Sequence, residues 1–357
     1  MEFSKTIFIT LLIFSCFVTI IVSIYTQQIS NYLNLKDKPD FKRKLHKKNV
    51  PLTGSIPLIL ILIFTLLLNI FFEIITDIDY LLILISSLCI YFVGFIDDKF
   101  GLTPIKKISL ISLIAIVTIV SSKDLIVSKF YISFYDAFFY IDYFAIFFTV
   151  LCLLTLTNSF NLIDGINGLA TGVLIIWLLS YIFMFSNYFN SSELNGFNFF
   201  IILLSINLLI IFYFNFRGKF FLGDSGSLFL SYFFGLIIIK SVNTYYNQDI
   251  LVGYSAENIF LIFLIPFSDM IRVMILRIEK RTNPFGGDRN HFHHLIFDYF
   301  NQNNFAIIVY FLFISLPIIL GAIFHKFYAI KPIIIIFITI LVFLISCKLI
   351  FLNKKIK

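Results

Sequence analysis

The densest group of side chains suited to chemistry lies in the stretch NPFGGDRNHFHHLIFD, residues 283–298. Three of the chain's five histidines, His291, His293 and His294, stand there within four residues, next to Asp288 and Arg289. A closed zinc site takes four ligands, mostly nitrogen or sulfur, and the stretch contains no cysteine. A guanidinium fork and imidazole N–H groups suit the oxygens of a phosphate. The stretch therefore favours phosphate recognition, with a zinc site or a structural loop as the alternatives.

Three further turns carry carboxylate or amide oxygens beside glycines. They read GFIDDKFGLTPIKK (94–107), NSFNLIDGINGLATG (158–172) and FLGDSGS (221–227). Their candidate ligands are Asp97, Asp98, Asn158, Asn161, Asp164, Asn167 and Asp224. Hard oxygen donors suit magnesium better than zinc, and glycines let backbone N–H groups approach a ligand closely. Neither GxxxxGK[ST] nor GxGxxG is present, so we expect neither a P-loop nor a Rossmann nucleotide site.

The composition of the whole chain is typical of a membrane protein. Hydrophobic residues make up 60% of the 357 residues and charged residues 13%, with a mean hydropathy of +0.98. Soluble domains are about half apolar and about a quarter charged. Apolar runs long enough to cross a bilayer predict eleven spans, at 7–25, 53–72, 79–96, 106–120, 143–157, 168–187, 197–214, 225–241, 257–276, 305–324 and 330–352. Because no stretch between them is long enough to fold alone, we expect one all-α polytopic domain over residues 1–357.

Two segments need a separate interpretation. Residues 125–142, LIVSKFYISFYDAFFYID, alternate apolar and polar residues and are rich in aromatics. This pattern predicts a short β-hairpin outside the membrane. The first span is followed by no small-residue cleavage site, so we expect it to remain as an anchor.

The distribution of lysine and arginine predicts the orientation, since these residues accumulate in cytoplasmic loops. Seventeen of them lie in 26–52, 97–105, 158–167, 215–224, 277–304 and the tail 353–357, which share one side. The loops of the other side hold four, Lys5, Lys123, Lys129 and Lys326. We therefore expect the N-terminus outside, the C-terminus in the cytoplasm, and all the polar turns on the cytoplasmic side. The net charge of +7 then reflects orientation and lipid headgroup contact rather than nucleic-acid binding.

In order along the chain, five motifs resemble those of the polyprenyl-phosphate N-acetylhexosamine-1-phosphate transferases, glycosyltransferase family 4, which is related to phospho-N-acetylmuramoyl-pentapeptide transferase. They are DKPDFKRKLHKKNVPLTGS, GFIDDKFGL, NSFNLIDGINGLATG, FLGDSGS and NPFGGDRNHFHHLI, spread from residue 37 to 296. The resemblance implies transfer of a sugar 1-phosphate from a UDP-sugar to polyprenyl phosphate such as undecaprenyl phosphate, with release of UMP. RNHFHHLI is more similar to the N-acetylhexosamine branch, which makes UDP-N-acetylglucosamine the leading donor and another UDP-N-acetyl sugar the alternative.

The resemblance also implies roles for the candidate residues. Asp97 and Asp98 would prepare the lipid phosphate, one of them as a base if a base is needed, and Asp224 and Asn161 would hold magnesium or manganese. The substrate-binding residues would be Lys107, Asn158, Asp164, Asn167, Asp288, Arg289, His291, His293 and His294. The expected place is the bacterial inner membrane, with the active site in the cytoplasm, membrane lipids as neighbours and a homodimer left open. The expected role is the first membrane step of cell-wall or polysaccharide synthesis.

Two other classes of protein remain as alternatives. Asp269 and Arg272 lie inside the ninth predicted span, and ions within the membrane often mark transport paths. Their simpler interpretation is a neutralising pair on one helix face. Transporters usually show internal repeats and a site at the bilayer midplane, whereas this chain shows no repeat and gathers its polar motifs at one surface. A scaffold that has lost activity is the third interpretation, which the retained Asp97, Asp98 and Asp224 disfavour.

Overall fold

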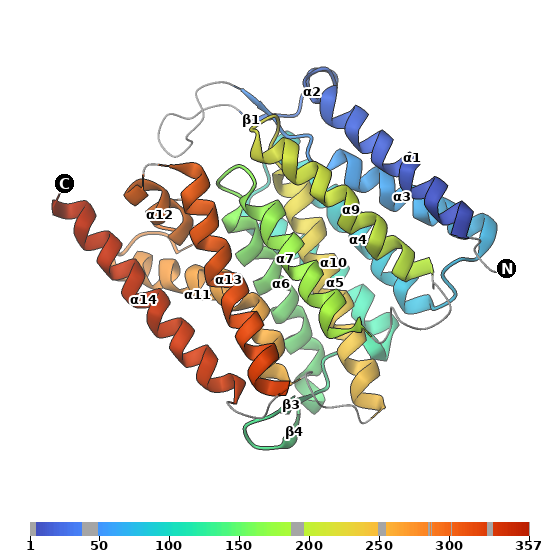
Figure 1. The fold of residues 1–357 in the computed structure, drawn as a ribbon. Coiled ribbons are helices and arrows are strands. Elements are labelled where there is room, and N and C mark those ends of the chain that lie inside the picture. Colours follow the sequence, from blue (N-terminus) through green and yellow to red (C-terminus); the bar gives the residue numbers. More distant parts are fainter. Residues whose placement is uncertain are drawn as a thin grey trace.

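Helices make up most of the chain, as its apolar runs predict (Figure 1). The computed structural model describes residues 5–37, 49–186, 196–248, 255–284, 286, 288–300, 302–326 and 331–356. The helices are α1 (Lys5–Ile24), α2 (Thr26–Leu33), α3 (Ile56–Phe72), α4 (Ile78–Phe100), α5 (Pro104–Ser121), α6 (Ala145–Ile163), α7 (Leu169–Met184), α9 (Gly196–Phe216), α10 (Gly223–Asn247), α11 (Ala256–Glu279), α12 (Phe292–Phe300), α13 (Asn303–Lys326) and α14 (Pro332–Ile356). Each predicted span coincides with one of these helices. Residues 38–48, 187 and 330, which belong to predicted motifs or spans, lie outside the described residues.

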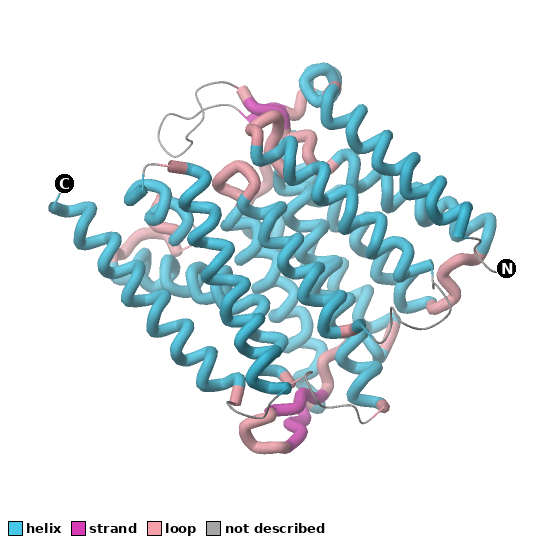
Figure 2. Tube along the Cα trace, viewed as in Figure 1, coloured by secondary structure: helices cyan, strands magenta, loops and turns pink. Residues whose placement is uncertain are grey.

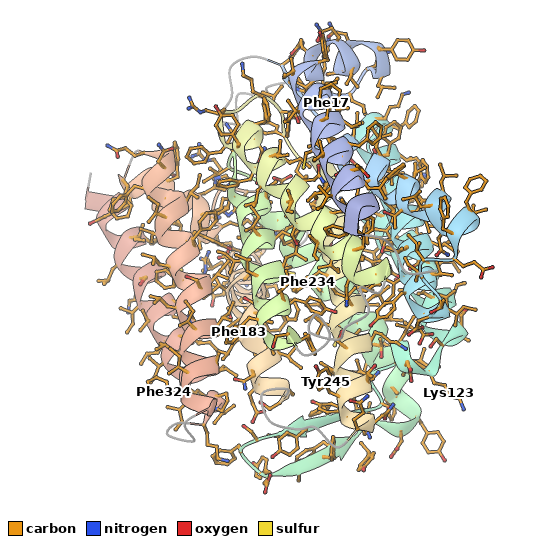
Figure 3. All side chains as sticks on the ribbon, turned by 45° about the vertical axis from the view of Figure 1, so that its right-hand side comes forward. Phe17, Lys123, Phe183, Phe234, Tyr245 and Phe324 are labelled. Carbon is orange, nitrogen blue, oxygen red and sulfur yellow. The ribbon has the colours of Figure 1, made fainter. Side chains whose placement is uncertain are left out.

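The described helices confirm an all-α polytopic membrane protein. Seven of them are long and apolar enough to cross a bilayer, and an eighth crossing follows if α1 and α2, which meet at 69°, form one broken span. Helices α3 and α7 are apolar but shorter. Outer helices expose large apolar side chains, among them Phe17 and Phe183, as a lipid-facing surface requires (Figure 3). The count of eleven spans stays a prediction.

Helix α10 forms the centre of the bundle. The apolar part of α10 is entirely buried, and α4 and α6 pack along it. Small residues permit this close packing: a Cβ built on Gly94 of α4 would lie 2.5 Å from the Cα of Ser225. Trp177 of α7 fills the space beside α10, with its ring 5.2 Å from that of Phe234. The close contact between α4 and α10 places the polar ends of these two helices side by side.

A buried charge cluster joins α10 to the neighbouring elements at the other end of the bundle. Lys240 of α10 is only 6% exposed. Its ammonium contacts the carboxylate of Asp79 on α4 and lies 2.9 Å from that of Asp124, in the short helix η1 (Lys123–Leu125). Asp77, the N-cap of α4, lies 3.5 Å away. The cluster compensates the charge of a lysine that would otherwise be buried alone.

The hairpin predicted over 125–142 is present. Strands β3 (Lys129–Ile132) and β4 (Ala137–Tyr140) pair antiparallel, with Lys129 opposite Tyr140. Glu257 at the start of α11 accepts hydrogen bonds of 3.1 Å from the backbone N–H groups of Ser133 and Phe134. A second short pair, β1 (Lys36–Asp37) with β2 (Val50–Pro51), lies at the opposite end of the bundle, beside the polar turns (Figure 2).

Candidate active site

Asp98, in the last turn of α4, holds the first turn of α10. Its Oδ1 accepts the N–H of Asp224 at 2.8 Å, and its Oδ2 accepts the N–H of Ser225 at 2.9 Å and the hydroxyl of Ser225 at 2.7 Å. The first N–H groups of a helix lack partners within it, and the helix dipole favours a negative charge there. Gly223 has φ +77°, and a Cβ on it would lie 2.7 Å from Oδ2 of Asp98. Asp98 therefore fixes where Asp224 stands, and Gly223 leaves room for it.

Lys107 bridges the carboxylates of Asp97 and Asp224. Its ammonium lies 2.7 Å from Oδ2 of Asp97 and contacts Oδ2 of Asp224. Asp97 also accepts the N–H of Leu102 at 2.6 Å, which fixes the turn between α4 and α5. The three charged side chains are 11–31% exposed, so water screens them only in part. Two carboxylates facing one cation form a pair of ligands that a divalent ion could share.

Asn161 approaches the same group from the last turns of α6. Its amide nitrogen donates to Oδ1 of Asp224 at 2.9 Å and to the hydroxyl of Ser227 at 2.8 Å. The amide oxygen is then the atom that could bind a metal, because an amide nitrogen is not a ligand for a hard cation. Asp224 is thus held by contacts from α4, α5 and α6.

The turn from α6 to α7 carries Asp164 and Asn167. Burial raises the pKa of the Asp164 carboxyl to about 8, and the nearby carboxylates of Asp224 and Asp98 act in the same direction. Asn215, buried at the end of α9, accepts the N–H of Gly168 at 2.8 Å and so holds the turn in place. Oδ1 of Asn167 is buried and has no hydrogen-bond partner among the described residues, which leaves it for a ligand.

The histidine stretch takes part in two ion pairs, and one of them connects it to α11. Arg277 donates through Nε to Asp288 at 2.8 Å, and Arg289 donates to Asp298 of α12 at 2.7 Å. Burial by itself would raise the pKa of Asp288, but the bond from Arg277 and the hydrogen bonds from Asn290 lower it to about 2. Asp288 therefore acts as a structural anion in the unliganded protein.

The histidines present unsatisfied nitrogens. Nε2 of His291, both ring nitrogens of His293 and Nδ1 of His294 are buried without a hydrogen-bond partner in the part of the chain that is described. Burial and the positive charge of Arg289 lower the pKa of His294 to about 4, and burial with the neighbouring imidazoles holds the pKa of His293 well below its usual value. Unpaired buried polar atoms are costly, so their presence in a group points to a polar ligand.

Gly165 connects the carboxylate and histidine parts of the site. A Cβ on Gly165 would lie 2.7 Å from Nε2 of His293 and 3.3 Å from Nε2 of His294. The negative charges of Asp98 and Asp224 help to raise the pKa of Asp164, the preceding residue, so all three carboxyl groups lie near one another. The four polar turns thus form one continuous site at one end of the bundle, the end with β1 and α12 in Figure 1.

The donor set fits magnesium better than a closed metal site. The described residues contain no group of three His, Cys, Asp or Glu side chains arranged to hold a metal. Magnesium commonly takes one or two carboxylates and completes its octahedron with water and phosphate oxygens. Asp224, with the amide oxygen of Asn161, offers such an incomplete set.

Comparison with known proteins shows which family part of the chain resembles. Residues 80–242 match the family model described as glycosyl transferase family 4. Over these residues the chain is similar to glycosyl transferase family 4. It is similar to the probable undecaprenyl-phosphate N-acetylglucosaminyl 1-phosphate transferase of Bacillus subtilis, at 26% identity over 84% of this chain and 80% of that protein. The undecaprenyl-phosphate alpha-N-acetylglucosaminyl 1-phosphate transferases of Escherichia coli (strain K12) and Thermotoga maritima are each 27% identical, over 76% and 79% of this chain and 71% and 78% of their own lengths.

The structure brings together most of the residues that the sequence predicts for the site, and it adds supporting residues that the sequence did not single out. The structure brings Asp97, Asp98, Lys107, Asn161 and Asp224 into direct contact, and places the remaining candidates around them, except one. Asn158 lies one turn before Asn161 on α6, half-buried, and the structure does not bring it into the hydrogen-bonded cluster of described residues. The supports that sequence reasoning missed are Ser225, Asn215 and Arg277. Only Arg277 carried a signal, as a charge just beyond an apolar run; Ser225 and Asn215 carried none.

Proposed function

We propose that the chain transfers a sugar 1-phosphate from a UDP-N-acetylhexosamine to polyprenyl phosphate and releases UMP. The names of its relatives support the reaction, with undecaprenyl phosphate as the acceptor and N-acetylglucosamine as the sugar. The observation that carries the proposal is the meeting of acidic residues, a lysine and unpaired histidine nitrogens at one end of an apolar bundle. This arrangement lets a lipid phosphate and a nucleotide diphosphate meet at the surface of a membrane.

The carboxylate part of the site serves the reacting phosphates. A divalent cation, Mg²⁺ or Mn²⁺, would be held by Asp224 and Asn161 and would stabilise the charge that develops on the diphosphate. Lys107 would release one of its two carboxylates and turn toward the phosphate that replaces it. Asp98 stays with the N–H groups of α10, so its role is to position Asp224. A lipid phosphate with a second pKa of about 6 is already largely a dianion at neutral pH and needs no strong base. Asp97 would act through Lys107, because it holds the ammonium group that could bind this phosphate.

The histidine part of the site serves the diphosphate-sugar. Arg289 and the ring nitrogens of His291, His293 and His294 would donate to phosphate oxygens, which supplies the partners that the buried nitrogens lack. Asn167 and Asp164 would face the nucleotide, and the raised pKa of Asp164 leaves its carboxyl able to donate a hydrogen bond near neutral pH. The family match ends at residue 242, so the roles of Arg289 and the three histidines rest on geometry.

The orientation follows from the same proposal. UDP-sugars are made in the cytoplasm, so the site would face it, with the N-terminus outside and eleven crossings of the bacterial inner membrane. The loops rich in lysine and arginine then lie on the cytoplasmic side, as expected for membrane proteins.

UMP release from purified protein in detergent tests the proposal. UDP-N-acetylglucosamine is supplied with and without polyprenyl phosphate and with and without magnesium, and we expect release only when all are present. Asp224→Asn should lose nearly all turnover, whereas Glu279→Gln, the same change at an exposed position at the end of α11, should keep it. UMP release with a different UDP-N-acetyl sugar, and not with UDP-N-acetylglucosamine, would change the assigned donor but support the same reaction. No release from any such donor by folded protein would overturn the proposal.

A further inference from the structure

One face of α11 holds the histidine stretch at several points. Arg277 donates to the backbone oxygen of Pro284 at 2.8 Å, and Arg272 donates to that of Asn290 at 2.6 Å. Asp269 receives the N–H of Phe292 at 3.1 Å. Positions 269, 272 and 277 share one side of a helix, so a single rigid element holds residues 284, 290 and 292.

Asp269 is the most heavily engaged of these residues. It is 1% exposed, and its two oxygens accept bonds from four donor atoms. Arg272 donates to Oδ1 through Nε at 3.2 Å and through a terminal nitrogen at 2.6 Å, and the N–H of Phe292 reaches both oxygens at 3.1 Å. Nδ1 of His291 lies 3.0 Å from Oδ2. Because all donors converge on it, the carboxylate is fixed in the ionised form and in one orientation.

This contact determines which nitrogen of His291 remains for a ligand. A carboxylate can only accept, so Nδ1 carries the proton that it donates to Asp269. Nε2 is then the free position, and it is buried without a partner among the described residues. The ring of His291 lies parallel to that of His293, with centroids 5.9 Å apart, and His293 borders Gly165 in the turn of Asp164. The free nitrogen therefore belongs to the same site as the carboxylates.

We propose that Asp269 is a positioning residue that acts through His291, presenting Nε2 to a phosphoryl oxygen of the nucleotide sugar. The inference rests on the proposed function. A bound phosphoryl group and the carboxylate of Asp269, on opposite sides of the ring, would together favour a second proton at Nε2, and Nε2–H would then donate to the phosphoryl oxygen. Arg272 pairs with Asp269 on the same helix, and Arg289, two residues before His291 in the chain, pairs with Asp298. Asp269 is thus part of the binding of the donor sugar nucleotide rather than of an ion path through the membrane.

A double-mutant cycle separates this role from a purely structural one. Asp269 also caps α12 through Phe292, and that contribution does not depend on the histidine ring. If Asp269 acts through His291, Asp269→Asn should raise KM for the UDP-sugar about tenfold or more, the loss expected for one charge-assisted hydrogen bond. KM for polyprenyl phosphate should stay unchanged. In the His291→Ala background, Asp269→Asn should add less than about twofold.

The control is Asp298→Asn, which removes a carboxylate of the same segment that pairs with Arg289. The increase in KM for the UDP-sugar caused by Asp298→Asn and the increase caused by His291→Ala should multiply in the double variant. If Asp269→Asn does not accumulate as folded protein, Asp269→Glu, which keeps the charge but moves it by one methylene, replaces it in the cycle. Equal effects of the Asp269 change with and without the histidine would overturn the positioning role and leave the transferase reaction standing. A folded wild-type protein that neither binds nor turns over any UDP-N-acetyl sugar would overturn both.

Discussion

Replacing Lys107 by methionine leaves the carboxylates of Asp97 and Asp224 facing each other. The same ammonium contacts both Oδ2 atoms, so these oxygens lie at most about 5 Å apart. At that distance, with an effective dielectric constant of about 20, two negative charges repel by about 3–4 kcal/mol. Loss of one partner from a buried ion pair typically costs about 3–5 kcal/mol. We therefore expect Lys107→Met to lower the free energy of unfolding by about 3 kcal/mol when magnesium is absent.

Magnesium should reverse much of this loss. A divalent cation between the two carboxylates replaces the missing ammonium, and an ion present at about 100 times its dissociation constant stabilises the folded state by about 2.7 kcal/mol. The measurement is chemical unfolding in mixed micelles with EDTA or with magnesium. Lys106→Met, the same change at the exposed neighbouring lysine, is the control and should respond little to either condition. A Lys107→Met protein as stable as the wild type in EDTA, and unchanged by magnesium, would refute both the ion-pair geometry and the metal assignment.

Three further changes probe other parts of the structure. Gly165→Ala should reduce turnover strongly while the protein stays folded, because its Cβ would displace His293; Gly286→Ala, where the nearest atom is 3.2 Å away, is the milder comparison in the same assay. His294 has a folded pKa of about 4, below its unfolded value of about 6.5. Its contribution to stability is therefore present above pH 6.5 and is lost as the pH falls toward 4. In the His294→Gln variant the unfolding midpoint should depend less on pH across that range. Glu257→Gln should cost about 2 kcal/mol and make the β3–β4 hairpin easier to cleave by protease, with UMP release preserved, because the hairpin lies at the end away from the site.

The sequence predicted the helices and the hairpin well because their signals are local. Apolar runs longer than about 17 residues, and one alternating aromatic stretch, each determine an element without reference to the rest of the chain. Asp97, Asp98 and Asp224 were found for a similar reason, since each carboxylate stands out beside glycines at the end of an apolar run. The number of crossings was harder, because helices such as α3 and α7 are apolar yet short.

The supporting contacts of the site could not be predicted from the sequence. Asp98 and Ser225 are 127 positions apart, and a serine in a helical turn carries no sign of its distant partner. Asp269 and Arg272 were interpreted as a neutralising pair on one helix face, and the pair is present. What the pattern could not show is that Asp269 also reaches His291 and Phe292 from another segment. Such a contact depends on how two helices come together, which periodicity does not encode.

The charge cluster around Lys240 bears on how the chain is inserted during synthesis. A lysine in the middle of a membrane helix costs about 2.5–3.5 kcal/mol when the helix enters lipid alone, and Lys240, nearer the end of α10, would cost less than that but would still oppose insertion. The counter-charges of Lys240, which are Asp77, Asp79 and Asp124, all precede it along the chain. When α10 leaves the ribosome, α4 and η1 have therefore already been made and can receive it. Helix α10 can then pack against these earlier elements as it is inserted, instead of entering lipid with an unpaired lysine. The order of the elements along the chain thereby favours insertion of the central helix.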